Sequence, residues 1–105
     1  MASARPSKGE PGTESARVRL RLYVSAVSPI SARAVVNLRR FLEAHFEGKH
    51  SLEILELSAN AAQARRDQII ASPTLLLLNE TPPRRLIGDL SNEAKLRAAL
   101  VQGLR

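Results

Sequence analysis

The chain of 105 residues carries thirteen arginines and three lysines against ten acidic residues, a formal net charge of +6. It has no cysteine, which excludes disulfide bonds, thiolate catalysis and cysteine-based metal sites. The length suits one domain. Since the chain contains no apolar run long enough to span a membrane and its N-terminal stretch lacks the apolar core of a secretory signal, we expect a cytoplasmic protein with no membrane segment.

The N-terminal stretch differs in composition from the rest of the chain. Residues 1–16 are rich in proline, glycine, serine and glutamate and offer almost nothing to bury. Such a composition is typical of disorder at a terminus. We therefore expect a disordered tail over residues 1–16 and a folded domain over residues 17–105.

The first folded segment is predicted to be a strand. Over residues 17–24, Val18, Leu20, Leu22 and Val24 alternate with three arginines and Tyr23, which is the period of a half-buried strand. A helix follows, because Ser28 and Pro29 are favoured at the N-cap and first helical position. Its apolar stripe is Ile30, Ala34, Leu38, Phe41 or Leu42, and His45 or Phe46, and Gly48 is expected to end it.

The remaining segments complete an α/β order. Residues 51–57 carry apolar side chains on both faces, as a covered parallel strand does. Residues 59–70 are rich in helix formers, and Ser72 with Pro73 is expected to break that helix. Residues 74–78 and 84–88 flank a turn and predict a hairpin.

A terminal helix closes the predicted domain. Ser91 is its expected N-cap, with Glu93 in the first turn and a buried stripe of Ala94, Leu96, Leu100, Val101 and Leu104. The order βαβαββα, with a right-handed crossover between the first two strands, is a thioredoxin-like plan. Residues 75–78 are four leucines, which suit a helix nearly as well as a strand.

Thioredoxin-like domains place their chemistry in the loop after the first strand and at the next helix N-terminus. Ser28 and Ser31 stand there with the spacing of a Cys-x-x-Cys pair, but a hydroxyl cannot exchange disulfides, so redox catalysis is excluded. Ser28 could polarise a bound thiol such as glutathione. It could also simply cap the helix, the interpretation that we favour.

No other motif indicates a cofactor or a metal. His45 and His50 lack further ligands at metal-binding spacing, and no phosphate-binding glycine loop is present. The arginine pairs at 65–66 and 84–85 suit either a solvated face or a docking surface for an acidic protein. Nucleic acid is disfavoured, because only three residues are aromatic and two of them have core spacing.

Several stretches, taken in order, resemble the KaiB family of circadian clock proteins. They are LYVSA at 22–26 with SPISARA at 28–34, FEG at 46–48, DQIIASPTL at 67–75 and PPRRLIGDLS at 82–91. The chain is identified as a divergent member. It has Ala26-Val27 where the family usually has Gly-Asn, and Glu53 and Gln68 where lysine is common.

The resemblance implies a non-enzymatic adaptor without cofactors that binds a KaiC-type ATPase. Partner-binding residues carried over from the family lie on the second helix and its flanks for KaiC, and around Arg33 and Glu53 for a KaiA-like protein or a histidine kinase. The partner-binding set is Arg33, Glu53, Ala61, Gln63, Ala64, Arg65 and Asp67.

The resemblance also implies two folds for one sequence. The binding-competent state is thioredoxin-like, and a resting homo-oligomer, a dimer or tetramer, has the order βαββααβ. In thioredoxin-like folds the proline at position 73 is usually cis, although the residues alone favour trans. The residues expected to determine the fold are Ser28, Pro29, Pro73, Arg84, Arg85, Gly88 and Asp89.

Two other functions compete with this adaptor. One is a thioredoxin-like relative of oxidoreductases and transferases that binds glutathione. The other is a KaiB-like sensor module of a histidine kinase, which the absence of a kinase domain from these 105 residues disfavours.

Overall fold

The computed structural model describes residues 17–103, and the expected tail over residues 1–16 lies outside them, as does Leu104. The strands are β1 (Val18–Val24), β2 (His50–Glu56), β3 (Thr74–Leu77) and β4 (Arg84–Ile87). The α-helices are α1 (Pro29–His45), α2 (Ala61–Arg66) and α3 (Glu93–Gly103), with the 3₁₀ turn η2 (Ser58–Asn60) before α2. None of the described helices is long and apolar enough to cross a membrane.

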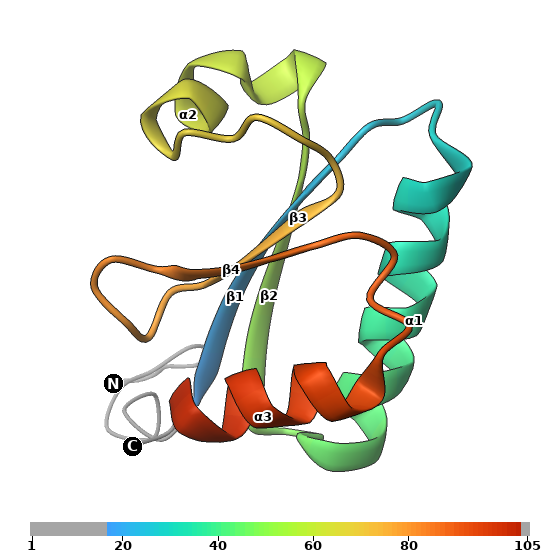
Figure 1. Ribbon diagram of the computed structural model, residues 1–105, viewed down its shortest axis with the longest axis vertical. Coiled ribbons are helices and arrows are strands. Elements are labelled where there is room, and N and C mark those ends of the chain that lie inside the picture. The colour runs from blue at the N-terminus through green and yellow to red at the C-terminus, as the bar shows by residue number, and fades with distance from the viewer. Residues whose placement is uncertain (1–16, 104–105) are drawn as a thin grey trace, which may run out of the picture.

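The four strands form one sheet in the order β2-β1-β3-β4 (Figure 1). β1 and β2 are parallel, in register from Val18 opposite His50 to Val24 opposite Glu56. β3 runs antiparallel to β1, and β4 antiparallel to β3. This topology confirms the predicted thioredoxin-like βαβαββα order, with its parallel first pair and its hairpin.

The larger core lies between the sheet and the two long helices. Val18, Leu20, Leu22 and Val24 of β1 point into it, as the alternation predicted, and meet the buried stripes of α1 and α3. The α1 stripe is Ser31, Ala34, Leu38, Phe41 and Leu42. Ile30 is 46% exposed, so its prediction as a core residue is wrong. The first inward position is Ser31, one residue later on the helix.

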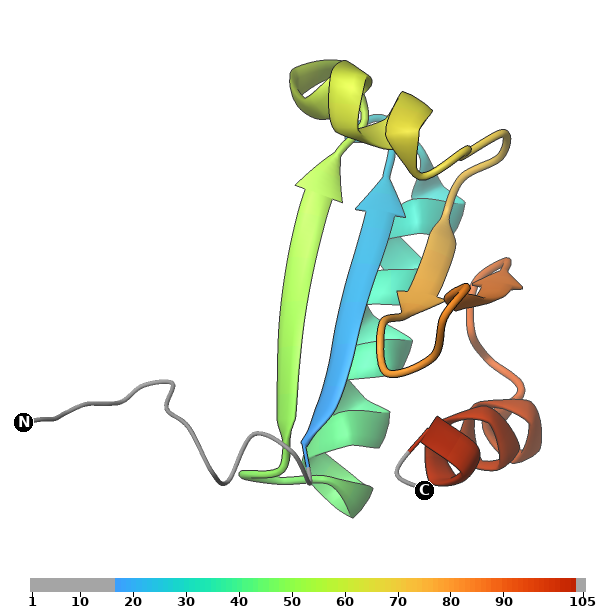
Figure 2. The same ribbon diagram turned by 90° about the vertical axis from the view of Figure 1, so that its left-hand side faces the viewer.

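A smaller core lies on the opposite face, which α2 covers only in part. Figure 2 shows α2 across the end of the sheet where β1 and β2 finish, with α1 behind the strands. Tyr23, Ala64 and Leu76 are the buried centre of this cluster, and Leu55, Leu57, Ile69 and Leu78 pack around them. β2 is an edge strand whose residues are half-buried or exposed, so the expected covered strand is covered only in part.

The start of α1 is as predicted. Ser28 is the N-cap, and its hydroxyl accepts a hydrogen bond from the Ser31 N–H at 3.2 Å. Pro29 occupies the first turn, where a backbone N–H has no acceptor within the helix, so the N–H that proline lacks costs no hydrogen bond. The helix itself ends at His45, three residues before Gly48, which has a φ of +74° and turns the chain toward β2.

The second helix is shorter than predicted. It ends at Arg66, and Asp67 is its C-cap, so Ser72 and Pro73 do not break it. Gln68 then adopts a φ of +58°, a left-handed conformation that no helix continues through. The chain turns there toward β3, which brings Ile69 into the smaller core.

The third helix begins one residue later than predicted. Asn92, and not Ser91, caps it: the Asn92 Oδ1 accepts from the Lys95 N–H at 3.1 Å. Its buried residues include Leu96, Ala99 and Leu100. Ala94 is exposed and Val101 is 44% exposed, so their predicted burial is wrong.

The leucine run is a strand. β3 is paired on both sides, and all four of its residues are buried. Leu75 and Leu77 point into the larger core and Leu76 into the smaller one. Burial on both faces thus settles the choice that helix propensity left open.

Candidate functional site

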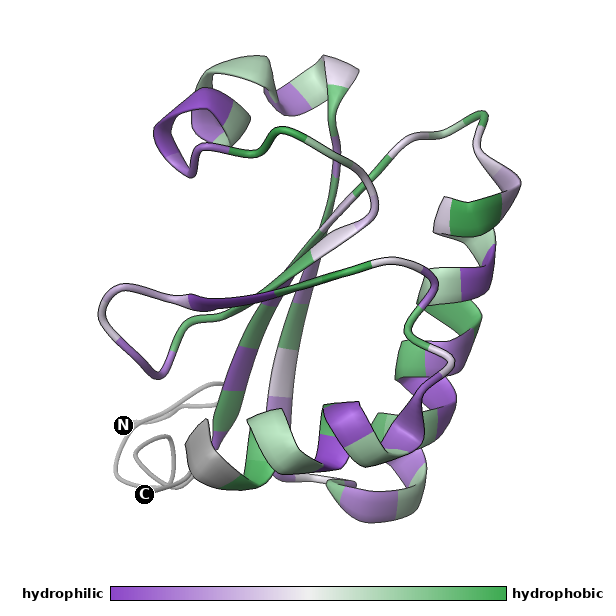
Figure 3. Ribbon diagram, viewed as in Figure 1, coloured by the Kyte–Doolittle hydropathy of each residue, from purple (hydrophilic) through white to green (hydrophobic). Residues whose placement is uncertain are grey.

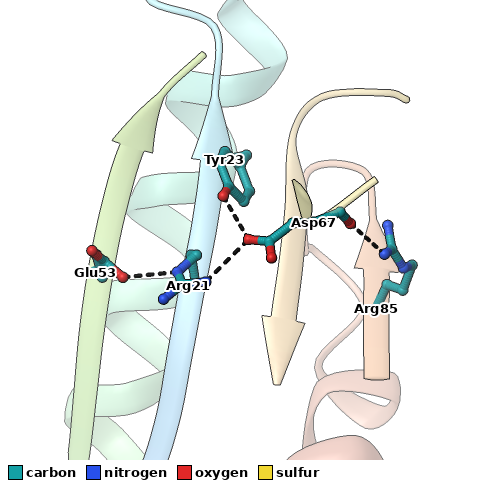
Figure 4. A network of polar contacts seen from close by, with 5 residues as sticks. All are labelled: Arg21, Tyr23, Glu53, Asp67 and Arg85. Carbon is teal, nitrogen blue, oxygen red and sulfur yellow. Dashed lines mark hydrogen bonds and ion pairs between the residues drawn. The ribbon is translucent and has the colours of Figure 1, made fainter. Parts of the chain in front are cut away.

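A chain of polar contacts crosses the α2 side of the sheet (Figure 4). The Arg21 guanidinium lies between two carboxylates, with Nε 2.8 Å from Glu53 Oε1 and Nη1 3.0 Å from Asp67 Oδ2. The Tyr23 hydroxyl donates to the same Asp67 oxygen at 2.6 Å. Side chains from β1, β2 and the end of α2 therefore form one network.

The sheet register explains how these groups meet. Arg21 stands opposite Glu53 in the parallel β1–β2 pair and opposite Leu76 in the β1–β3 pair. Arg21 and Tyr23 are two residues apart, so they share the face that α2 covers. Asp67 follows the last turn of α2, which directs its carboxylate onto that face.

The network changes the acidity of its members. Burial is the main cause that raises the pKa of Tyr23 to about 12, and the hydrogen bond to the Asp67 carboxylate raises it further. The pKa of Arg21 is also raised, chiefly by the hydrogen bond to Glu53. Arg21 and Tyr23 therefore both keep their protons at neutral pH.

Arg85 ties β4 to the end of α2. Its guanidinium donates to two backbone carbonyls, Nη2 to Asp67 O at 2.6 Å and Nη1 to Gln68 O at 3.1 Å. Both carbonyls lie just past the end of α2, at the C-cap residue and the one after it, so Arg85 satisfies groups that otherwise need water. The neighbouring Arg84 instead pairs with Glu80 at 3.0 Å on the exposed hairpin.

The loop that carries thiols in thioredoxins holds two serines with structural roles. The Ser28 hydroxyl caps α1, and the Ser31 hydroxyl, on a residue only 1% exposed, accepts from the Ser25 N–H at 3.0 Å. A shallow cavity of about 170 Å³ adjoins them, and its lining residues are all alanine, valine or serine. Within residues 17–103, no group of three or more His, Asp or Glu side chains could hold a metal ion.

The family is decided by two comparisons of sequence. The family model described as "KaiB domain" matches residues 21–101. The circadian clock oscillator protein KaiB of Thermostichus vulcanus is 41% identical over 81 residues, which cover 77% of this chain and 75% of that protein. The chain belongs to the KaiB family. KaiB of Synechococcus elongatus, 40% identical, covers 77% of this chain and 79% of its own length.

Solved structures agree on the fold of this KaiB-family chain. Fasciola hepatica thioredoxin superposes with a TM-score of 0.71 at 14% identity, over 86% of this chain and 84% of that one. The N-terminal domain of Synechococcus elongatus SasA gives 0.66 at 19% identity, over 97% and 95%. At these identities the likeness shows the thioredoxin-like fold alone.

The KaiB-family residues predicted to bind partners lie in different surroundings. Ala61 and Arg65 are exposed on α2, and Gln63 is half-buried. Ala64 is 7% exposed and packs in the smaller core, so its side chain offers a partner almost no surface. The Asp67 carboxylate is held by Arg21 and Tyr23.

The two residues predicted to face a further partner lie apart from α2. Arg33 is exposed on α1, with Nε 3.9 Å from the Asp89 carboxylate. Glu53 lies on the open sheet face, paired with Arg21. Nothing in the described structure tests whether either residue binds a protein, so both assignments stay predictions.

Of the residues predicted to determine the fold, Pro73 and Gly88 meet beside the start of β3, whereas Arg84 lies opposite Leu77 at its end. The Ser72–Pro73 bond is cis, as the resemblance implied, and Pro73 is buried. The Pro73 carbonyl accepts from the N–H of Gly88, whose φ of +117° suits glycine. The Asp89 carbonyl accepts from Asn37 at 2.8 Å, and hydrogen bonds from Ser91 lower the pKa of the Asp89 carboxyl.

Arg21 and Tyr23 are the members of the network that sequence reasoning missed. Their alternation with apolar residues placed them on a polar face, but Tyr23 is fully buried there. The carboxylate that accepts its hydroxyl lies 44 residues later in the chain. The only local indication of this network in the sequence is a single tyrosine on a strand face that otherwise carries arginines.

Proposed function

We propose that this KaiB-family chain is a non-enzymatic regulatory protein of a circadian clock or a clock-derived stress response, and that it acts by binding a KaiC-type ATPase. The observation that carries the proposal is the family match over residues 21–101. That match includes α2 with both of its flanks and the whole hairpin. Relatives matched over the same length are named circadian clock oscillator proteins.

The site chemistry supports binding over catalysis. Cysteine is absent from the sequence, and both serines at the position of the thioredoxin thiols are engaged in backbone hydrogen bonds. Arg21 and Tyr23, whose pKa values are both raised, keep their protons at neutral pH, so neither of these two groups provides a general base or a nucleophile there. The shape and charge of its surface are therefore the means by which we propose that the chain acts on other molecules.

The proposed docking surface for the ATPase is the outer side of α2 and its flanks. Ala61 and Arg65 are exposed there, while Ala64 anchors the helix to the core from beneath. Arg21 and Arg85 hold the end of α2 at Asp67 from two sides, and a surface fixed before binding loses less conformational entropy on association. Arg33 and Glu53 are proposed to face a KaiA-like protein or a histidine kinase.

Co-elution with the KaiC-type ATPase of the same organism tests the proposal. The wild-type chain is expected to form a complex in size-exclusion chromatography, and Ala61→Glu on α2 to weaken it. Ala98→Glu, an equal change at an exposed alanine of α3, is the matched control and should bind as the wild type does. Failure of the wild-type chain to bind any cognate ATPase contradicts the proposal.

No observation favours the two alternative functions. Fasciola hepatica thioredoxin shares the fold but is only 14% identical in sequence, and the SasA domain is 19% identical. Retention of this chain on immobilised glutathione, together with failure to bind the ATPase, is the result that reverses the order of the hypotheses.

A further inference from the structure

A cavity of about 370 Å³ opens between the end of α2 and the β3–β4 hairpin. We call it the arginine pocket. Its lining residues are Arg66, Asp67, Gln68, Leu76, Pro82, Pro83 and Arg85. Leu76 belongs to the buried centre of the smaller core, so the pocket reaches down to the packed sheet.

The arginine pocket has an excess of positive charge. Arg66 and Arg85 line it, and Arg65 precedes Arg66 on α2. All three are exposed, and none of them forms an ion pair within residues 17–103. Figure 3 shows hydrophilic residues both at the end of α2 and at the start of β4. With Arg21 and its two carboxylates included, four arginines face two acidic side chains, which leaves two positive charges unbalanced.

The acidic residue in the lining does not cancel this charge. The Asp67 Oδ2 accepts from Arg21 and Tyr23, and Figure 4 shows the carboxylate directed toward them and away from Arg85. What Arg85 contacts is the backbone carbonyl of Asp67, a neutral acceptor. The lining therefore presents cationic side chains and apolar walls.

The walls suit a protein segment better than a nucleic acid. Pro82, Pro83 and Leu76 provide aliphatic surface for a side-chain stem, and no lining residue is aromatic. Nucleic-acid surfaces commonly stack bases on aromatic rings. The one tyrosine on this face is buried, and both phenylalanines are in the larger core.

We propose that the arginine pocket and Arg65 bind an acidic protein segment, with an aspartate or glutamate seated between Pro82, Pro83 and Arg66. The inference rests on the proposed function, since it states the charge of the surface that α2 meets on the ATPase. A guanidinium binds a carboxylate with directed hydrogen bonds, and an exposed pair of this kind adds selectivity and association rate more than affinity.

A purely structural role for Arg65 and Arg66 is the competing interpretation. Cations in the last turn of a helix interact favourably with its dipole, and the effect is small at exposed positions. That role predicts a small loss of stability in Arg66→Glu and no change in the salt dependence of binding. The two roles therefore differ in a measurable quantity.

Titration of the KaiC-type ATPase with Arg66→Glu, Arg66→Lys and Arg97→Glu separates these roles. We expect Arg66→Glu to weaken binding roughly tenfold at low salt and to flatten its salt dependence, because exposed charges are screened beyond about 8 Å at physiological ionic strength. Arg66→Lys should keep most of the affinity. Arg97→Glu, the same charge change on the exposed side of α3, should bind as wild type.

If the wild-type chain binds the ATPase with an affinity that neither salt nor Arg66→Glu changes, the proposed function stands and this inference is wrong. Circular dichroism and thermal unfolding confirm that each variant is folded. Complete absence of an ATPase complex instead contradicts the proposed function, and a second probe then decides the inference alone.

That second probe is a polyglutamate peptide added to the full chain and followed by NMR. We expect amide shifts concentrated at residues 65–68 and 82–85 that disappear in Arg66→Glu. Shifts on α3 only, or none at low salt, overturn the inference. Tighter binding of a DNA or RNA oligonucleotide than of polyglutamate at these residues also overturns it.

Discussion

The hydroxyl of Tyr23 donates a hydrogen bond of 2.6 Å to the carboxylate of Asp67, and this contact joins the centre of the sheet to the end of α2. Arg21 reaches the same carboxylate oxygen at 3.0 Å. Both donors come from β1, the strand that pairs with β2 and β3, so the position of α2 is fixed by the most securely held part of the sheet.

Tyr23 is expected to ionise near pH 12, well above the usual value of about 10 for tyrosine. It is the only tyrosine, and the chain has no tryptophan, so the ultraviolet absorbance of tyrosinate reports this one group. Asp67→Asn should lower the midpoint of the Tyr23 titration, because a negative charge beside the hydroxyl is removed. The midpoint should stay above 10, because the hydroxyl remains buried. A wild-type midpoint near 10 in the folded protein contradicts the burial of this hydroxyl.

The same shift makes stability depend on pH in the alkaline range. The pKa of Tyr23 is raised in the folded state, so its stabilising effect is complete below about pH 10 and is lost as the pH rises toward about 12. The difference in unfolding free energy between the wild type and Tyr23→Phe, measured in urea, should shrink over that interval. A difference that grows with pH contradicts the sign of the shift.

Tyr23 and Asp67 should be coupled in a double-mutant cycle. Tyr23→Phe is expected to cost about 1 kcal/mol for one hydrogen bond, and Asp67→Ala about 1–3 kcal/mol because two buried or half-buried donors lose their acceptor. The double variant should cost less than the sum. Arg84 and Glu80, an exposed ion pair, provide a control whose coupling is expected below about 1 kcal/mol.

The helix caps give a test of where α3 begins. Ser28→Ala and Asn92→Ala each remove a side chain that accepts a backbone N–H at a helix start, at an expected cost of about 1 kcal/mol. Ser91→Ala keeps the bond from the Ser91 N–H to Asp89 and should cost less than Asn92→Ala. If Ser91→Ala loses more stability than Asn92→Ala, the N-cap of α3 is Ser91 instead.

Local patterns predicted those parts of the fold that local physics decides. The alternation over β1 and the Ser28-Pro29 start of α1 depend on residues next to each other, and both are confirmed. The end of α2 depends on Gln68, which takes a left-handed conformation, and on Arg85, which binds the helix end from a distant strand. The helix propensities of residues 59–70 predict neither the conformation of Gln68 nor the contact of Arg85.

The candidate site was less predictable for the same reason. The alternation of residues 17–24 predicts Tyr23 on a polar face, because the other residues on that face are arginines, and only the fold brings α2 over it. The family resemblance predicts Ala64 as a partner-binding residue, but the short α2 buries this one alanine. Its burial follows from which side of α2 meets the sheet, which requires the chain after Asp67 to turn back to β3.

Arg85 is expected to stabilise the end of α2 specifically. Arg85→Met removes two hydrogen bonds to the carbonyls of Asp67 and Gln68, and amide exchange in α2 should accelerate about tenfold, the equivalent of 1.4 kcal/mol. Arg84→Met, which loses only the pair with Glu80, is the control and should leave α2 unchanged. Equal exchange rates in the two variants contradict this role.

The same variant tests the alternative βαββααβ fold, which stays a prediction. If Arg85 holds the thioredoxin-like arrangement, Arg85→Met should shift NMR secondary chemical shifts over residues 60–103 from strand toward helix around Leu75 and Leu76. A loss of α2 without any gain of helix there indicates simple local unfolding and counts against a second fold.

The proposed function depends most on α2 being the surface that meets the KaiC-type ATPase. A cryo-electron microscopy structure of the full chain bound to the ATPase from the same organism tests this directly. We expect Ala61, Arg65 and Arg66 to lie in the interface while α3 faces solvent. A complex in which α3 carries the contact, or a bound state that leaves α2 free, contradicts it.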